Sequence, residues 1–310
     1  PRFRVTVGDA RRFVRATQNR YDLIVSDNFH PARSGSGSLY TVEHFEAVRD
    51  RLGPGGLFCQ WLALHQLDLD TLRSIVRSFM TVYPGGWAML ATNSLETPVL
   101  GLVALNDRQR FDIDPIRNRL ASVATPRSPA EFGIADDLAL LGNFIAGPSA
   151  LARFAGNAPR NTDDHPVVTY AAPRMTYAPT SLPRDRLLDL LREVNISPDE
   201  LVATPADLAW RSRLVAYWAA RNQFIEAGRD VRPTHEVRHM LSQVREPLLA
   251  VLRISPDLRP AYDPLLRMAI ALGRIDAPAS KALLAELRDV QPTWPQAAQA
   301  LHDLSSGGVR

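Results

Sequence analysis

The residues best placed to do chemistry lie where one short apolar run meets a carboxylate. Residues Leu23–Ser26 have the composition of a buried parallel strand, and Asp27 follows them directly. In open α/β sheets ligands bind beyond the carboxyl ends of the strands, so Asp27 occupies a position suited to catalysis. A carboxylate there could instead cap the following turn, and the spacing alone leaves both interpretations open.

Three further residues with polar side chains belong to the segments around Asp27. His30 follows Asp27 in the same loop, Tyr40 lies at the end of that loop, and Gln60 ends the next apolar strand. A buried Gln must be hydrogen-bonded, either by a substrate or by the backbone. Tyr40 could equally anchor the helix that follows it.

No metal site is predicted. His30 has no Cys, Asp or His partner at ligand spacing. The run Asp163–His165 is typical of turn chemistry and solvated charge, and His235 and His239 are typical of a surface helix that lacks a third ligand.

The elements that must position these residues alternate as they do in an α/β domain. The patterns predict strands at 4–7, 23–26 and 57–61, helices at 10–16, 42–51 and 69–82, and an antiparallel pair of strands at 87–91 and 99–104. Gly53–Gly56 predicts a turn, residues 108–160 a helical and loop-rich region, and residues 161–170 a loop that enters one last strand.

Composition changes after this region. Three prolines among Thr, Ser and Ala at 172–183 indicate an extended segment, so a linker is predicted at 175–184, between a domain at 1–174 and a helical region at 185–310. Within the helical region, Leu248–Arg253 with Pro256 recurs as Leu283–Arg288 with Pro292, at an offset of 35 to 36 residues. This wording is typical of a tetratricopeptide-like helix–turn–helix repeat. Such a region could bind a protein partner, support a homo-oligomer or simply pack on the first domain.

The order of motifs in the first domain resembles the polyamine aminopropyltransferases, the spermidine synthase family. The resemblance covers roughly residues 3 to 174 and rests on GDA at 8–10, SDNFHP at 26–31, GSLYT at 37–41, GGLFCQWL at 55–62 and NTDDHPVVTYAAPR at 161–174. These sequence motifs look most like those of bacterial spermidine-synthase-like proteins in which a membrane-embedded half precedes the catalytic domain.

The resemblance implies a fold, a reaction and a role for each candidate residue. The fold would be a methyltransferase-like (Rossmann-type) sheet, and the reaction aminopropyl transfer from decarboxylated S-adenosylmethionine to a polyamine-type amine. Asp27 would accept the proton of the amine nucleophile, which is protonated at neutral pH. Gly8, Asp9 and Ala10 would bind the nucleoside, with Asp9 also able to cap the next helix. His30, Tyr40 and Gln60 would line the acceptor side.

His30 departs from the family pattern, which usually has a second acid at this position. An acid that holds a cationic amine is thus replaced by a residue that is neutral or positive near pH 6.5. This substitution leaves room for a different amine or for a methyltransferase-like reaction with S-adenosylmethionine. A non-catalytic binding or scaffold domain that keeps the fold is a third interpretation.

Two strands of the family's sheet have no counterpart in the sequence. They would lie between the strand at 4–7 and the strand at 23–26, so their absence leaves a gap of roughly 10 Å. No Gly-x-Gly motif follows a strand to hold the nucleoside. We therefore expect this chain to be the C-terminal portion of a longer protein, inactive by itself. That protein would have a cytoplasmic catalytic domain tethered through an upstream membrane segment.

Bulk properties narrow the class of partner. The net charge is only +3, and the arginines are scattered among acids, so a nucleic-acid surface is not supported. No stretch approaches the ~20 apolar residues that span a bilayer. The single cysteine, Cys59, lies in an apolar strand and is expected to be a small buried hydrophobe.

Overall fold

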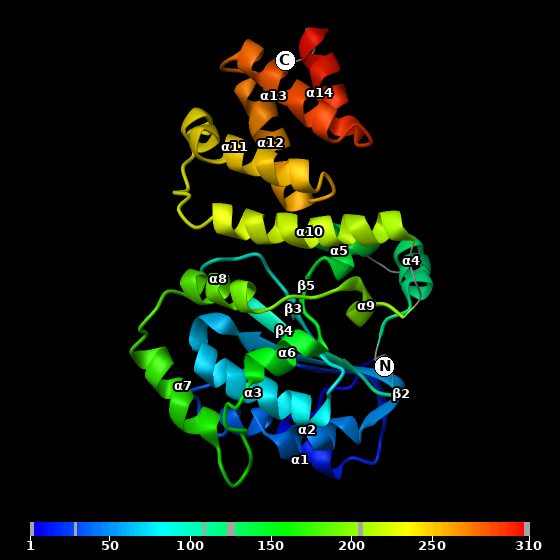
Figure 1. The fold of residues 1–310 in the computed structure, drawn as a ribbon, viewed down its shortest axis with the longest axis vertical. Coiled ribbons are helices and arrows are strands. Elements are labelled where there is room, and N and C mark those ends of the chain that lie inside the picture. Colours follow the sequence, from blue (N-terminus) through cyan, green and yellow to red (C-terminus); the bar gives the residue numbers. More distant parts are fainter. Residues whose placement is uncertain (1–2, 28–29, 108–109, 123–127, 204–206, 307–310) are drawn as a thin grey trace. The chain divides into compact units, whose positions relative to one another are not determined.

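The computed structural model describes residues 3–27, 30–107, 110–122, 128–203 and 207–306 of the 310-residue chain. The chain divides into two compact units (Figure 1). The first unit is formed by residues 1–119 and 143–206, and the second by residues 120–142 and 207–310. Each unit is described separately.

The first unit alternates helices and strands over most of its length, which agrees with the predicted α/β class. Its elements are α1 (Ala10–Ala16), β1 (Tyr21–Ser26), the 3-10 helix η1 (Ser36–Tyr40), α2 (Val42–Arg49), β2 (Leu52–Ala63), the 3-10 helix η2 (Leu64–Gln66), α3 (Leu69–Val82), β3 (Trp87–Leu90), β4 (Val99–Leu105), β5 (Phe144–Ala146), α6 (Pro148–Ala155), α7 (Val167–Tyr177), α8 (Pro183–Glu193) and α9 (Pro198–Leu201). Helix α4 (Ile113–Ala121) ends at the division between the units.

The strands form one mixed five-stranded sheet in the order β1-β2-β4-β3-β5. β1 pairs with β2 in parallel, whereas the β2–β4, β4–β3 and β3–β5 pairs are antiparallel. The predicted antiparallel pair of strands is therefore confirmed as β3 and β4. β5 was not predicted, because its three residues are too few to show a period against the surrounding loops.

The predicted turn at Gly53–Gly56 lies within β2. Between Tyr21 and Leu23 of β1, the paired residue on β2 moves from Leu52 to Leu57, so the four residues between them form a bulge in the strand. Gly55 has a φ of 67°, which few other residues adopt. The prediction of a turn was wrong as an element boundary, because the chain leaves the ladder and re-enters it.

β1 is an edge strand and is not buried as predicted. Leu23 is 57% exposed and Val25 is 52% exposed. Parallel strands normally have both faces covered, which makes this exposure unusual. The prediction of a strand at residues 4–7 was also wrong, since these residues carry no regular secondary structure, and Val5 and Val7 are exposed.

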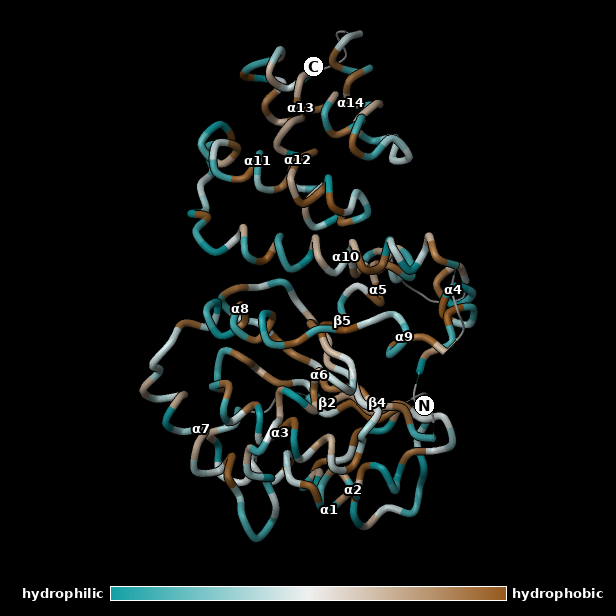
Figure 2. Tube along the Cα trace, in the orientation of Figure 1, coloured by the Kyte–Doolittle hydropathy of each residue, from teal (hydrophilic) through white to brown (hydrophobic). Residues whose placement is uncertain are grey.

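Helices α2 and α3 cover one face of the sheet through an aromatic cluster. Phe45 of α2 lies edge-on to Phe79 of α3, with ring centroids 5.7 Å apart, and both contact Phe58 of β2. All three rings are fully buried. Figure 1 shows α1, α2 and α3 on the same side of the sheet, and Figure 2 shows hydrophobic stretches along its strands. The predicted bounds of α3 agree with those observed, and its Asp68 caps the helix by accepting a hydrogen bond from the Thr71 amide.

The segment predicted as a loop entering a last strand is a loop entering a helix. Residues from Val167 onward form α7, which extends to Tyr177 and so occupies the start of the predicted 175–184 linker. Val168, Ala172 and Met175 are its buried residues, at the i, i+4, i+7 spacing of one helix face. Val167 and Val168 have a high strand propensity, but burial of the face formed by Val168, Ala172 and Met175 stabilises a helix instead.

The second unit consists of helices: the 3-10 helix η3 (Pro129–Phe132), α5 (Asp137–Leu141), α10 (Leu208–Ala227), α11 (Val237–Ile254), α12 (Arg259–Leu272), α13 (Ala277–Val290) and α14 (Pro295–Ser305). It therefore starts later than the predicted region at 185–310 and also includes residues 120–142. α13 ends as many residues after α11 as α14 starts after α12. The pair α11–α12 and the pair α13–α14 therefore have the same spacing along the chain. Their assignment as tetratricopeptide-like stays a prediction.

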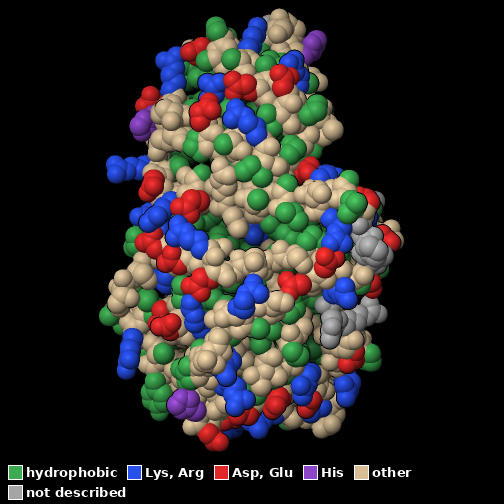
Figure 3. All heavy atoms as spheres, viewed as in Figure 1, with side chains coloured by type: hydrophobic (Ala, Val, Ile, Leu, Met, Phe, Trp, Pro, Cys, Tyr) green, Lys and Arg blue, Asp and Glu red, His purple; other side chains and the backbone are tan. Residues whose placement is uncertain are grey.

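Charged side chains of both signs are interspersed over the face of the molecule shown in Figure 3. No helix within the described ranges is both long and apolar enough to cross a membrane.

Candidate functional site

The parallel pairing of β1 and β2 brings Asp27 and Gln60 together. Ser26 pairs with Gln60, so the residue after β1 lies beside the Gln60 side chain. The Gln60 amide donates to the carbonyls of Ser26 (3.5 Å), Asp27 (3.4 Å) and Trp61 (3.0 Å). Asp27 itself is exposed at the edge of the sheet.

Gln60 is fully buried, yet only one end of its amide is satisfied by the protein. Its Oε1 is buried and accepts no hydrogen bond from any described residue. The three carbonyl contacts fix the amino group on one side, so Oε1 must face the other side. Gln60 Oε1 is therefore an acceptor without a partner among the described residues. An unsatisfied buried acceptor costs roughly 1–3 kcal/mol.

A pair of histidines lies near this end of the two strands. His30 is half-buried, and His65 lies in η2, directly after β2. The charge of His30 acts on His65, and the Nδ1 atoms of both rings are buried without a hydrogen-bond partner among the described residues. Burial lowers the pKa of His65, the charges of Arg186 and His30 lower it further, and a hydrogen bond to the Pro98 carbonyl opposes them. His65 therefore favours its neutral form.

Arg186 of α8 completes this neighbourhood. Its side chain is buried and donates to the carbonyls of Ser181 (2.6 Å) and His65 (2.9 Å). Burial also lowers the pKa of Arg186. This neighbourhood thus carries two imidazoles and a guanidinium.

His65 and Arg186 are residues that the sequence reasoning missed. His65 had a usable signal, because it follows the strand adjacent to the one that ends at Asp27, and such strand ends share one edge of the sheet. Arg186 had none, since it lies far along the chain in a helix with ordinary amphipathic spacing.

Tyr40 is 1% exposed, so it lies in the core. This agrees with the interpretation of Tyr40 as an anchor for α2, and its contact with a substrate stays a prediction.

Gly8, Asp9 and Ala10 are exposed at the start of α1. The Asp9 carboxylate accepts a hydrogen bond from the Arg12 amide (2.9 Å), which is the geometry of a helix N-cap. The capping role is therefore present, and nucleoside binding by these residues stays a prediction.

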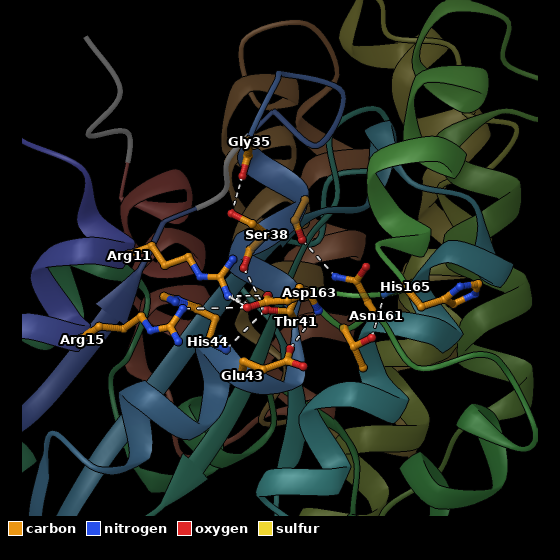
Figure 4. Close-up of polar contacts among 12 residues, drawn as sticks. Arg11, Arg15, Gly35, Ser38, Thr41, Glu43, His44, Asn161, Asp163 and His165 are labelled. Atoms are coloured by element: carbon orange, nitrogen blue, oxygen red, sulfur yellow. Dashed lines mark hydrogen bonds and ion pairs between the residues drawn. The ribbon is translucent and has the colours of Figure 1, made fainter.

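Asn161 connects the loop after Asp27 to three helices (Figure 4). Its side chain is fully buried, donates to the Gly37 carbonyl (2.9 Å) and accepts from the Val168 amide (3.1 Å). Its backbone donates to Ser78 Oγ (2.7 Å) and accepts from the Val42 amide (3.0 Å). One residue thus joins η1, α7, α3 and α2.

Asp163 makes a second connection, to α1. Both of its carboxylate oxygens accept hydrogen bonds from Arg11, and Arg15 lies 3.8 Å away. Burial opposes ionisation of Asp163, but the hydrogen bonds and charge of Arg11 outweigh it and hold the pKa of the carboxyl below its ordinary value. Asp163 therefore has a specific partner and is more than a solvated turn residue.

His44 of α2 lies beneath this ion pair. It is 3% exposed, and burial, followed by the charge of Arg11, lowers its pKa from 6.5 to about 4. Asp163 acts in the opposite direction, and Arg15 adds to the lowering.

No group of three or more His, Cys, Asp or Glu in the described part of the chain is arranged to hold a metal ion. Cys59 is buried, as expected, and burial raises the pKa of its thiol to about 12. A thiol held protonated in this way is a poor nucleophile.

Comparison with known proteins agrees with the order of these motifs. Residues 1–95 match the family described as the spermine/spermidine synthase domain. The chain is 27% identical over 84 residues to the spermidine synthase of Dictyostelium discoideum, covering 27% of this chain and 29% of that protein. It is 27% identical over 140 residues to putrescine N-methyltransferase 2 of Nicotiana tabacum, covering 43% and 39%.

Among solved structures, a probable spermidine synthase from Corynebacterium glutamicum ATCC 13032 is similar, with a TM-score of 0.37 and 23% identity, covering 53% of this chain and 55% of that one. The chain thus matches between 29% and 39% of the length of the two sequence relatives named above. The similarity to the spermine/spermidine synthase domain lies in the N-terminal part of the chain, residues 1–95.

The buried state of His44 makes stability depend on pH. The unfolded chain takes up a proton near pH 6.5, whereas the folded chain resists protonation of His44 until about pH 4. The free energy of unfolding should therefore fall by about 2 kcal/mol between pH 7 and pH 5, as chemical denaturation would measure. His44→Leu should remove this part of the pH dependence. The matched change at exposed His165, His165→Leu, should retain it, and an equal slope in both variants would contradict the assignment.

Proposed function

We propose that the complete natural polypeptide transfers the aminopropyl group of decarboxylated S-adenosylmethionine to an amine. The observation that carries this proposal is the place of Asp27, at the carboxyl end of a parallel strand and beside buried Gln60, whose amino group donates to the Asp27 carbonyl. The family match of residues 1–95 supports the same reaction.

The chemistry requires a group that removes a proton from the amine. The amine nitrogen attacks the carbon beside the sulfonium, the carbon–sulfur bond breaks, and methylthioadenosine leaves as a neutral thioether. The leaving group needs little assistance. The nucleophile does, because an aliphatic amine with a pKa near 10 is almost wholly protonated at neutral pH. In this proposal the Asp27 carboxylate accepts that proton and offsets the charge that develops on nitrogen.

The acceptor side supports an amine other than a simple diamine. The residues that the proposal places there, His30, His65 and Gln60, include no carboxylate, and the cation of Arg186 lies next to His65. A second ammonium group would find no carboxylate from His30 or His65. The proposed acceptor therefore has one reacting amine and an uncharged, polar remainder.

Methyl transfer to an amine is the second candidate. It is favoured by the match to a protein named putrescine N-methyltransferase, which spans more of this chain than the match to the spermidine synthase. The same Asp27 would serve either reaction, because both place a nucleophilic amine opposite a sulfonium carbon. Assays of the complete natural polypeptide with decarboxylated and ordinary S-adenosylmethionine separate them by product, methylthioadenosine in the first case and a methylated amine in the second.

The exposed edge of β1 supports a sheet that further strands complete. Leu23 and Val25 are more than half exposed on a parallel strand, a position that is normally covered. The same proposal includes a membrane tether in the complete polypeptide, with this part in the cytoplasm. It also includes a protein partner or a second copy that binds the helical region.

Replacement of Asp27 should remove the transfer activity. Asp27→Asn keeps the shape of the side chain but cannot accept the amine proton, so kcat should fall at least about 100-fold. Asp22→Asn is the matched control, since Asp22 is an exposed acid of the same strand. Steady-state kinetics of the complete natural polypeptide measure both. An Asp27→Asn variant with an unchanged kcat would remove the proposed role.

Restoring the family's acid should restore binding of diamines. His30→Asp supplies one charge-assisted hydrogen bond to an ammonium group, which corresponds to a decrease of about tenfold in the KM for a diamine. His165→Asp adds the same charge at an exposed position and should leave that KM unchanged. A diamine KM that does not respond to His30→Asp would contradict the proposed acceptor side.

The 310-residue chain by itself should bind the nucleoside weakly. Asp9 is already engaged as a helix cap, and the neighbouring Gly8 and Ala10 are exposed. Calorimetric titration with S-adenosylmethionine measures the affinity directly. Tight binding would contradict the proposal that further strands complete the site.

A further inference from the structure

We propose that Asn161 is a positioning residue for the acceptor side of the transfer site. The inference rests on the proposed function, and it concerns a residue far along the chain from Asp27. Asn161 acts through the backbone of the loop formed by residues His30–Thr41, called here the 30–41 loop.

The 30–41 loop is a continuous series of hydrogen-bonded turns. The His30 carbonyl accepts from the Arg33 amide (3.0 Å), and the Arg33 carbonyl accepts from the Ser36 amide (3.1 Å). The Gly35 carbonyl accepts from both the amide (3.1 Å) and the hydroxyl (2.6 Å) of Ser38. Because these turns overlap along the chain, they couple the backbone of His30 to η1.

Asn161 holds η1 at its centre. The side-chain amino group donates to the Gly37 carbonyl at 2.9 Å, and the side-chain oxygen accepts from the first turn of α7 at Val168. A Cβ on Gly37 would meet Thr169 Oγ1 and would lie 2.9 Å from the Thr169 amide nitrogen, so α7 packs directly on this glycine. The 30–41 loop is therefore held between the Asn161 amide and the start of α7 (Figure 4).

The contact needs a side chain with one hydrogen-bond donor and one acceptor at its two ends. Gly37 offers an acceptor and Val168 offers a donor, so the side chain between them must donate on one side and accept on the other. An ionised carboxylate of the same shape accepts on both sides and would repel the Gly37 carbonyl. A protonated carboxyl group donates once and accepts once, and it would restore the contact.

Asp163 provides a comparison within the same segment. It lies two residues from Asn161, but its carboxylate binds mainly Arg11 of α1 and reaches the 30–41 loop at its last residue, Thr41. Its own amide donates to Glu43 (3.1 Å). α1 has no buried residue, so this polar connection matters for its position. Loss of the Asp163 carboxylate should therefore affect α1, whereas loss of the Asn161 amide should affect the 30–41 loop.

The test is Asn161→Asp in the complete natural polypeptide, studied at several pH values. At pH 8 the KM for the amine acceptor should rise about tenfold while the KM for the sulfonium donor stays within about twofold, because only the acceptor side loses its support. Burial at this position raises the pKa of the introduced carboxyl and so favours its protonated form as the pH is lowered toward 6. Relative to the unaltered protein, the acceptor KM should therefore recover over that range. Amide hydrogen exchange of residues 36–41 should be faster than in the unaltered protein at pH 8.

Two control variants separate this role from general destabilisation. Asn157→Asp makes the same chemical change at an exposed position and should alter neither KM nor exchange. Asp163→Asn should speed exchange in residues 10–16 and leave residues 36–40 protected, because Asp163 contacts the loop at its last residue, Thr41. In an active protein, unchanged exchange at 36–41 or a loss of kcat without a selective, pH-dependent change in acceptor KM would overturn the inference alone. Absence of transfer by the unaltered protein would overturn the proposed function, and the inference with it.

Discussion

The buried amide of Asn161 is the interaction on which the arrangement of the candidate site depends. A fully buried polar side chain persists only when its hydrogen bonds are made, and here the partners come from segments more than a hundred residues apart in the chain. The same residue uses its backbone to bind α2 and α3. The loop after Asp27 is thus held by the interior of the protein, although loops of this length usually owe their conformation to their own turns.

The second constraint is the parallel register of β1 and β2. Because Ser26 pairs with Gln60, the carboxylate that follows one strand and the amide near the end of the other lie at one edge of the sheet. The Gln60 amino group donates to three backbone carbonyls, and its side-chain oxygen accepts no hydrogen bond from any described residue. The strand register therefore places two polar groups close together on rigid elements, as a catalytic site generally requires.

Electrostatics distinguish this acceptor side from one built to hold a second ammonium group. Burial and the neighbouring guanidinium of Arg186 favour the neutral form of His65, and His30 occupies the position of the family's acid. A neutral imidazole can still orient a polar substrate, but it provides no charge to offset the desolvation of a cation. In the proposed reaction, the change from acid to imidazole would alter which substrates bind and would leave the position of Asp27 unchanged.

The sequence by itself determined the elements whose signals are local. The period of Leu72, Ile75, Val76 and Phe79 predicted α3 with its observed bounds, and the apolar run before Asp27 predicted a strand whose end carries the candidate base. The family resemblance also assigned Asp27 and Gln60 to one candidate site. Only the tertiary structure decided the exposure of Leu23 and Val25, the helical state of Val167–Tyr177 and the roles of Asn161, His65 and Arg186. The physical reason is that burial and hydrogen-bond partners are set by residues distant in the chain, and no periodicity within a short window records them.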